Sequence, residues 1–409
     1  MNADLSKAQR LILVGEAFRP STPVDDLDLF AGRDEQRGEF ISAVTQAGRH
    51  VGLYGERGVG KTSLARVMAA VFGGLRGFQA AMVSCSTEEN FSTLWHNIFR
   101  RLGREIEDYT PEGIRFELEQ LDSPTLIVID ELDRLDNDEA LTHLADTTKT
   151  LSDNAVPSTL VLVGVAASIG DLVGEHESII RNLQQIGMPR MQPDELRGIL
   201  SKGCEHARLE MEEDAVERIV SLSEGLPHYT HLLGHGSAER AVQEDRDRVT
   251  LADVEEAIPR AVRGHTIHSD YVKSIRSSQP GNLYREVLLA CAIAPKNSLG
   301  YFSSGQIRDP LEGIAGRRLD IPAFSRHMKE FLDPVRGSVL RREGKERSYS
   351  YRFSNPMMQP YVIMSSITDG MITPTQLADL QEKSRDVEAK VRSKEEEDAH
   401  AHGQLFLEP

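Results

Sequence analysis

One motif, followed by Ser63, constrains this chain more than any other feature: Gly55-Glu56-Arg57-Gly58-Val59-Gly60-Lys61-Thr62. It satisfies the pattern G-x4-G-K-[ST] at every fixed position, and it lies between a short apolar run and a segment with helical periodicity. In such a loop the glycines let successive backbone N–H groups point at phosphate groups, and the following helix adds its positive N-terminus. We therefore predict that residues 55–63 form a phosphate-binding loop between a buried strand and a helix.

Two acids are expected to complete this site. Asp130 and Glu131 follow the apolar run Thr125–Ile129, which is typical of a central parallel strand. Lys61 would reach the β- and γ-phosphates of ATP, and Asp130 would hold Mg²⁺ together with the Thr62 hydroxyl. Glu131 would orient and polarise the attacking water as a general base. These residues predict Mg²⁺-dependent ATP hydrolysis; the alternative is that the two acids only cap the following helix.

Strands and helices alternate around these motifs. Apolar runs at Ala80–Cys85 and Thr159–Val163 indicate further strands, with helical periodicity between them. We predict an α/β fold, a doubly wound parallel sheet with helices on both faces and ligands at the carboxyl ends of its strands. After Pro189 the pattern becomes purely helical as far as Leu251–Val262, which predicts a helical lid.

From about Tyr271 the pattern changes again. Predicted helices lead into two short strands, Ser338–Arg341 and Ser348–Phe353, joined by a charged turn that contains Gly344. Three helices followed by a hairpin predict a winged-helix domain. The predicted segments are an N-terminal segment at 1–24, a P-loop α/β domain at 25–188, a helical lid at 189–265, a winged-helix domain at 266–372, and a charged helix and tail at 373–409.

The distribution of charge bears on possible partners. The net charge of −17 argues against nucleic acid, but residues 261–370 carry about +6, which places a basic surplus on the predicted winged helix. A winged helix can lay its third helix in the major groove of duplex DNA and touch phosphates with its hairpin. The residues expected on that face are Arg317, Arg318, Arg326, Lys329, Arg342, Lys345 and Arg347. The alternative is a domain that packs on its own ATPase or on a partner protein.

Composition places the chain among folded soluble proteins. It has 409 residues, of which 39% are hydrophobic and 27% charged. No apolar run suits a signal peptide or a membrane span. Cys85, Cys204 and Cys291 lie far apart and form no CxxC pair. We therefore expect a cytoplasmic protein with buried thiols and no membrane partner.

Residues 25–262 resemble the AAA+ and STAND branch of P-loop ATPases, particularly initiator-like and archaeal-type ATPases with a C-terminal winged helix. Besides the glycine loop and the two acids, Leu29–Glu35 looks like the family's box near the adenine, which implies that Arg33 contacts the nucleotide site. By resemblance, Arg181 is an arginine finger that acts on the γ-phosphate of a neighbouring subunit, which implies a nucleotide-dependent homo-oligomer. The plainer interpretation of Arg181 is a surface arginine or an intrachain ion pair.

Gly225–Pro227 resembles the GxP turn that begins the last lid helices of STAND proteins, which implies that Pro227 and His228 lie beside the nucleotide. The second sensor arginine of AAA+ proteins is missing near this turn, and His228 is the nearest candidate. The polar sensor expected just after Val163 is also absent. These departures favour a switch that changes shape with its nucleotide over a fast motor.

His228, His231 and His235 share one face of a predicted helix. A metal site there is conceivable, but no Cys or acid completes it at short range, so we expect packing in the lid.

Two functions remain open. In the first, ATP drives assembly of subunits, the winged helix engages duplex DNA, and hydrolysis resets the assembly. In the second, of the signalling or defence type, the winged helix contacts a partner protein and needs no DNA. A non-hydrolysing nucleotide-binding scaffold is a third, which the Asp130–Glu131 pair opposes. The sequence holds no recognisable nuclease or protease centre, so an effector protein is expected to perform any downstream chemistry.

Overall fold

The computed structural model of the chain describes residues 5–166, 170, 182–279, 281–297, 300–345 and 348–387. By its contacts the chain forms two compact units, Met1–Leu251 and Ala252–Pro409. The boundary lies at the start of α12 (Leu251–Arg263), the helix predicted as the last of the lid. The finer division into five segments stays a prediction.

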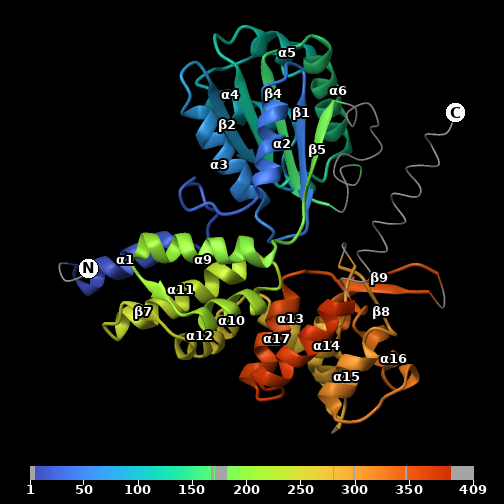
Figure 1. The fold of residues 1–409 in the computed structure, drawn as a ribbon. Helices are drawn as coiled ribbons and strands as arrows, with labels where there is room; N and C mark the ends of the chain where they lie inside the picture. Colours follow the sequence, from blue (N-terminus) through green and yellow to red (C-terminus); the bar gives the residue numbers. More distant parts are fainter. Residues whose placement is uncertain are drawn as a thin grey trace, which may run out of the picture. The chain divides into compact units, whose positions relative to one another are not determined.

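A parallel sheet forms the centre of the first unit (Figure 1). Its strands lie in the order β2-β3-β4-β1-β5, and all neighbours pair in parallel. Their bounds are β1 (His50–Gly55), β2 (Gln79–Ser84), β3 (Thr125–Asp130), β4 (Ser158–Val165) and β5 (Leu183–Met188). Because β4 lies between β1 and β3, the glycine loop and the two acids leave the same edge of the sheet, one strand apart. The predicted α/β fold with a parallel sheet is confirmed.

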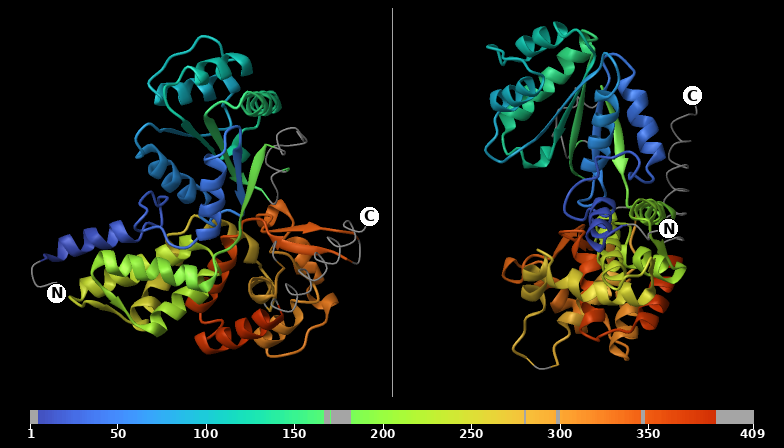
Figure 2. Two further views of the ribbon diagram at one scale, coloured as in Figure 1. Left: turned by 45° about the horizontal axis from the view of Figure 1, so that its top comes forward. Right: turned by 90° about the vertical axis from the view of Figure 1, so that its left-hand side faces the viewer.

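Helices cover both faces of this sheet (Figure 2). Their bounds are α2 (Asp34–Val44), α3 (Lys61–Gly73), α4 (Phe91–Arg101), α5 (Pro111–Glu119) and α6 (Asp138–Asp153). On one face α4, α5 and α6 enclose a core in which Trp95 is buried together with Ile127 and Ile129 of β3. Leu126 and Val128 alternate with these isoleucines and are equally buried, because successive side chains of a strand point to opposite faces.

A helical lid follows β5. Its elements are α9 (Pro193–Ala207), α10 (Glu213–Ser223), α11 (Pro227–Gln243), and the short parallel pair β6 (Glu210–Met211) and β7 (Arg248–Val249). These helices lie where the sequence predicted them, and Pro193 and Pro227 each occupy the first turn of a helix, where proline is tolerated.

The N-terminal helix α1 (Lys7–Ala17) packs on α9 and α11, a contact that the sequence did not predict. Phe18, directly after α1, is fully buried. Gly203 of α9 and Gly234 of α11 leave room for its ring, because a Cβ atom on them would lie 2.5 and 2.8 Å from the ring, respectively. The Phe18 ring thus packs between α9 and α11 and stabilises the contact of α1 with the lid.

The second unit combines short helices with a small antiparallel sheet in which β10 pairs with both β8 and β9. After α12 its elements are α13 (His268–Ile275), α14 (Tyr284–Ile293), β8 (Phe302–Ser303), α15 (Arg308–Ala315), α16 (Ile321–Glu330), η2 (Pro334–Arg336), β9 (Leu340–Glu343), β10 (Ser350–Phe353) and α17 (Met358–Thr368). The order from α14 to β10 agrees with the predicted winged helix. The structure differs from the prediction in several details. Strand β8 and the short helix η2 were not predicted, Arg342 lies in a strand rather than in the turn, and the buried helix α17 follows the hairpin.

In the part of the chain that the structure describes, no helix combines the length and apolar character needed to cross a membrane.

Candidate active site

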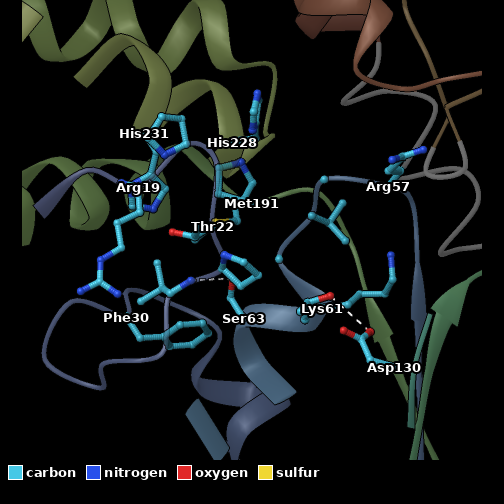
Figure 3. A pocket seen from close by; sticks show the side chains of 18 of the residues that line it. Arg19, Thr22, Phe30, Arg57, Lys61, Ser63, Asp130, Met191, His228 and His231 are labelled. Atoms are coloured by element: carbon cyan, nitrogen blue, oxygen red, sulfur yellow. Dashed lines mark hydrogen bonds between the residues drawn. The ribbon is translucent and has the colours of Figure 1, made fainter. Parts of the chain in front are cut away.

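The first unit contains a cavity of about 540 Å³ between the carboxyl edge of the sheet and the lid (Figure 3). Small-molecule sites commonly span roughly 300–1,000 Å³, so this volume suits a nucleotide. Figure 3 shows Lys61, Ser63 and Asp130 on the sheet side and Met191, His228 and His231 on the lid side. The predicted site residues that line the cavity are Arg33, Arg57, Gly58, Val59, Gly60, Lys61, Thr62, Ser63, Asp130, Glu131, Pro227 and His228, whereas Gly55 and Glu56 do not line it.

The backbone of the glycine loop adopts φ values that residues with a side chain rarely adopt. Gly55 has a φ of +149° and Gly60 a φ of +97°. A Cβ atom on Gly55 would lie 2.5 Å from the carbonyl oxygen of Met188 on the neighbouring strand β5. α3 begins after Gly60 with no capping side chain, whereas Asn90 caps α4. The first N–H groups of α3 are therefore available to an anion in the cavity.

Lys61 is buried, with 7% of its surface exposed. Its Nζ donates to the carbonyl oxygens of Gly55 at 3.0 Å and Glu56 at 2.7 Å. Burial lowers the pKa of Lys61 to about 8, although the carboxylates of Asp133 and Asp130 partly oppose this shift. A phosphate group in the cavity would compete for the ammonium and stabilise its charged form.

Thr62 and Asp130 come together from α3 and β3. Thr62 Oγ1 donates to Asp130 Oδ1 at 3.2 Å, and the Glu131 backbone N–H donates to the same oxygen at 2.9 Å. Burial raises the pKa of Asp130. A nearby cation would oppose this shift and favour the charged carboxylate. A hydroxyl beside a carboxylate fits Mg²⁺, which uses few protein oxygens and keeps several waters.

Glu131 lies in the turn between β3 and η1 (Leu132–Arg134), with a φ of +54° that is uncommon for a residue with a side chain. Its Oε2 pairs with Arg134 at 2.8 Å, and both side chains are about half exposed. Asp133 Oδ1 accepts a hydrogen bond from the Val165 N–H at 2.8 Å and so ties this turn to the end of β4. The turn holds Glu131 at the rim of the cavity, in reach of water.

Arg33 lines the cavity but also has a structural task that the sequence did not indicate. It is 3% exposed, and its Nη2 donates to the carbonyl oxygens of Val59 at 2.9 Å and Pro189 at 2.7 Å. Its backbone N–H donates to Glu195 Oε1 at 2.8 Å. Burial lowers the pKa of Arg33. The guanidinium therefore holds the glycine loop against the connection between β5 and α9.

Some residues that line the cavity belong to no recognisable sequence motif. Residues 19–24 line the cavity, and the Val24 N–H donates to Ser63 Oγ at 3.2 Å. Apolar side chains from three further places also line the cavity: Phe30, Met191 and Ile199.

Two lid histidines face this part of the cavity. His231 is buried, and its Nδ1 accepts a hydrogen bond from the Arg19 N–H at 3.4 Å. Burial lowers the pKa of His231 to about 4 and also lowers the pKa of His228, whose ring bonds the Pro20 carbonyl. Both rings are therefore neutral at neutral pH and pack residues 19–24 against α11. Among the described residues, no three His, Cys, Asp or Glu side chains are grouped to hold a metal.

A comparison of sequences places these features in a family. The sequence profile described as Novel STAND NTPase 1 matches residues 17–266, which is more than half of the chain. The chain belongs to the novel STAND NTPase 1 family. The predicted class of enzyme, a P-loop nucleoside triphosphate hydrolase of the STAND type, is thereby confirmed.

Solved structures share the fold of this STAND NTPase at low sequence identity. The ORC2 protein of Aeropyrum pernix matches with a TM-score of 0.50 and 16% identity, over 88% of this chain and 98% of that chain. Cdc6p of Pyrobaculum aerophilum matches with a TM-score of 0.49 and 15% identity, over 88% and 99%. No curated protein sequence matches the chain. These likenesses concern the fold alone.

The cations predicted to face DNA lie in the second unit of the STAND NTPase, and those that the structure describes are exposed. Arg326 pairs with Glu330 at 2.7 Å, and Arg342 stacks on the Tyr349 ring at 4.0 Å. The other four form no ion pair with a described residue: Arg317, Arg318, Lys329 and Lys345. Arg347 and the predicted finger Arg181 lie outside the described residues.

Proposed function

We propose that this STAND NTPase is a switch that binds Mg-ATP in the cavity, hydrolyses it, and moves its lid with the state of the nucleotide. One observation carries the proposal: Lys61, Thr62, Asp130 and Glu131 surround one cavity beneath a helical lid. His228 on α11 is the nearest candidate for the missing second sensor, and its ring is neutral rather than cationic, which favours a switch over a motor.

Each residue has its own task in this proposal. Lys61 and the N–H groups of the glycine loop hold the β- and γ-phosphates. Thr62 and Asp130 would hold Mg²⁺, which when bound neutralises developing charge on the phosphate oxygens. Glu131 accepts a proton from the attacking water through Oε1, since Oε2 pairs with Arg134.

We propose ATP as the nucleotide. The side chains of Phe30, Met191 and Ile199 give the cavity apolar walls that suit the faces of a purine. The Aeropyrum pernix ORC2 structure is described as ADPNP–ADP complexes, which supports an adenine nucleotide for the shared fold.

We further propose that the second unit contacts duplex DNA and that subunits assemble on ATP binding. Arg317, Arg318, Lys329 and Lys345 support the DNA contact, because exposed cations without acidic partners can bind phosphates. In the assembly, Arg181 would reach the γ-phosphate of a neighbouring subunit.

A signalling switch is the second candidate, in which the second unit contacts a partner protein. The family profile matches residues 17–266 and therefore does not include the basic residues of the second unit. The part of the chain that defines the family thus lacks the proposed DNA surface, which favours a partner protein. The net charge of −17 also weakens long-range attraction to nucleic acid.

Turnover of ATP by the wild type and by Glu131→Gln, with and without duplex DNA at two salt concentrations, tests these proposals. Loss of the general base should lower kcat by roughly 10²–10⁴-fold while ATP still binds. Glu139→Gln, at an exposed acid of α6, is the matched control. Stimulation by DNA supports the DNA-coupled switch, and turnover that ignores DNA supports the partner-protein switch. Wild-type turnover in Glu131→Gln would contradict the role of Glu131.

A further inference from the structure

An ion pair joins the glycine loop to the lid. Glu56 lies in the loop, and Arg190 lies in the connection between β5 and α9. Arg190 Nε donates to Glu56 Oε2 at 2.9 Å, and Arg190 Nη1 donates to the carbonyl oxygen of Glu224 at 3.2 Å. The side chains of Arg190 and Glu56 are each 25% exposed, so water screens their attraction only in part. One guanidinium therefore contacts both the loop and the lid.

The carbonyl that Arg190 contacts belongs to the turn that begins α11. Glu224 has a φ of +49° and Gly225 a φ of +76°. The Met191 N–H donates to the Gly225 carbonyl oxygen at 2.9 Å, and a Cβ atom on Gly225 would lie 2.7 Å from Arg190 Cβ. This hydrogen bond and this close packing hold the turn against the β5–α9 connection. Pro227, two residues beyond Gly225, lines the cavity.

The loop end of these contacts also involves Lys61, the residue proposed to bind phosphate. Lys61 donates to the Glu56 carbonyl oxygen at 2.7 Å and so fixes the Glu56 backbone from inside the loop. A β- or γ-phosphate would take the same ammonium. The Glu56 backbone then loses this bond, while its carboxylate remains paired with Arg190. A change at the phosphates is thereby passed to a residue that also holds the lid.

We propose that Arg190 is a positioning residue that couples phosphate occupancy of the glycine loop to the lid, through the Glu56 carboxylate and the Glu224 carbonyl. Arg190 does not line the cavity, so it acts on the lid rather than on the phosphates. The first arginine of α11 is Arg240, near its far end, so this helix has no sensor arginine beside the cavity. The inference rests on the proposed function, because it requires ATP in the cavity.

The full chain tests this coupling with two measurements on the wild type, Arg190→Gln, Glu56→Gln and the double variant. One is dissociation of a fluorescent ATP analogue with Mg²⁺, and the other is hydrogen exchange of the α11 amides with and without ATP. In the wild type, ATP should slow exchange in α11. Each single variant should lose at least about half of this protection and release the analogue roughly tenfold faster. The double variant should behave like the single ones, because all three lack the same contact.

Arg197→Gln is the matched control, since Arg197 pairs with Glu213 at 2.5 Å inside the lid and does not contact the glycine loop. Wild-type protection and dissociation in Arg190→Gln, additive effects in the double variant, or equal effects in Arg197→Gln would overturn the proposal. Arg190→Lys keeps one charged donor and replaces Arg190→Gln if that variant fails to fold; it should give an intermediate effect. Failure of the wild type to bind the analogue would instead overturn the proposed function, and this inference with it.

Discussion

Thr62 Oγ1 lies 3.2 Å from Asp130 Oδ1 across 68 residues of sequence. This contact joins the first turn of α3 to the end of β3, although β4 separates β3 from the strand that leads into α3. The parallel sheet therefore brings a hydroxyl and a carboxylate together at one edge, beside Lys61. Mg²⁺ binding and phosphate binding are expected to depend on each other through this contact.

The affinity for ATP should fall as the pH rises above about 8. Burial lowers the pKa of Lys61 to about 8, whereas bound phosphates would raise it, so binding above pH 8 takes up a proton. The Kd of a fluorescent ATP analogue should rise by up to about tenfold per pH unit from pH 8 to 9.5. Lys61→Met should bind weakly at pH 7 and lack this pH dependence. A wild-type Kd that stays constant from pH 7 to 9.5 would contradict the proposal that the charged Lys61 binds the phosphates of ATP.

Acid should destabilise the first unit through His50. This residue is fully buried; its Nε2 lies 3.1 Å from the Thr148 carbonyl oxygen, and its Nδ1 accepts a hydrogen bond from the Leu160 N–H at 2.9 Å. Burial lowers the pKa of His50 to about 4, against about 6.5 in an unfolded chain. Its contribution to stability is therefore complete above pH 6.5 and is lost as the pH falls toward 4, by up to about 3 kcal/mol.

Urea denaturation at pH 7 and pH 5 measures this effect. His50→Gln should be less stable than the wild type at pH 7 but should lose less stability between the two values, because glutamine does not titrate. His96→Gln, at an exposed position on α4, is the control and should follow the wild type. If His50→Gln and the wild type lose the same unfolding free energy between pH 7 and pH 5, a group other than His50 causes the loss.

Replacing Phe18 by alanine should strongly destabilise the lid. The ring is fully buried between Gly203 and Gly234, so its removal leaves a cavity and costs about 3–5 kcal/mol of unfolding free energy. Ile12→Ala is the matched control on α1, since this side chain is 60% exposed and its loss should change stability by at most about 0.5 kcal/mol. Equilibrium unfolding in urea compares the two. A loss below about 1 kcal/mol for Phe18→Ala would mean that α1 does not dock as described.

Replacing Lys329 and Lys345 by alanine should weaken DNA binding and reduce its dependence on salt. Each phosphate contact contributes about 0.9 to the slope of log K against log salt, so the double variant should lose about 2 from that slope. Fluorescence anisotropy of a labelled duplex at several salt concentrations measures it. Lys149→Ala, at an exposed position of α6, shows how far the loss of one positive charge outside the second unit changes the slope. An unchanged slope would remove these lysines from the DNA surface and favour a partner protein.

The sequence by itself determined the centre of the site. The glycine loop and Asp130–Glu131 are recognisable because their chemistry depends on spacing within a few residues and on an apolar run directly before them. The same local patterns predicted the alternation of strands and helices in the first unit and, in the second, the helices α14, α15 and α16 followed by the strands β9 and β10. Such features need no knowledge of distant contacts, because each is fixed by neighbours along the chain.

Only the tertiary structure decided what surrounds that centre. Arg33 contacts Pro189 across 156 residues, and Arg190 contacts Glu56 across 134. α1 packs on α9 and α11 of the lid, and residues 19–24 line the cavity without any motif. These positions follow from which side chains meet after the sheet and the lid have formed. A sequence pattern reports the local preference of a segment, whereas contacts over such distances depend on packing of the whole unit.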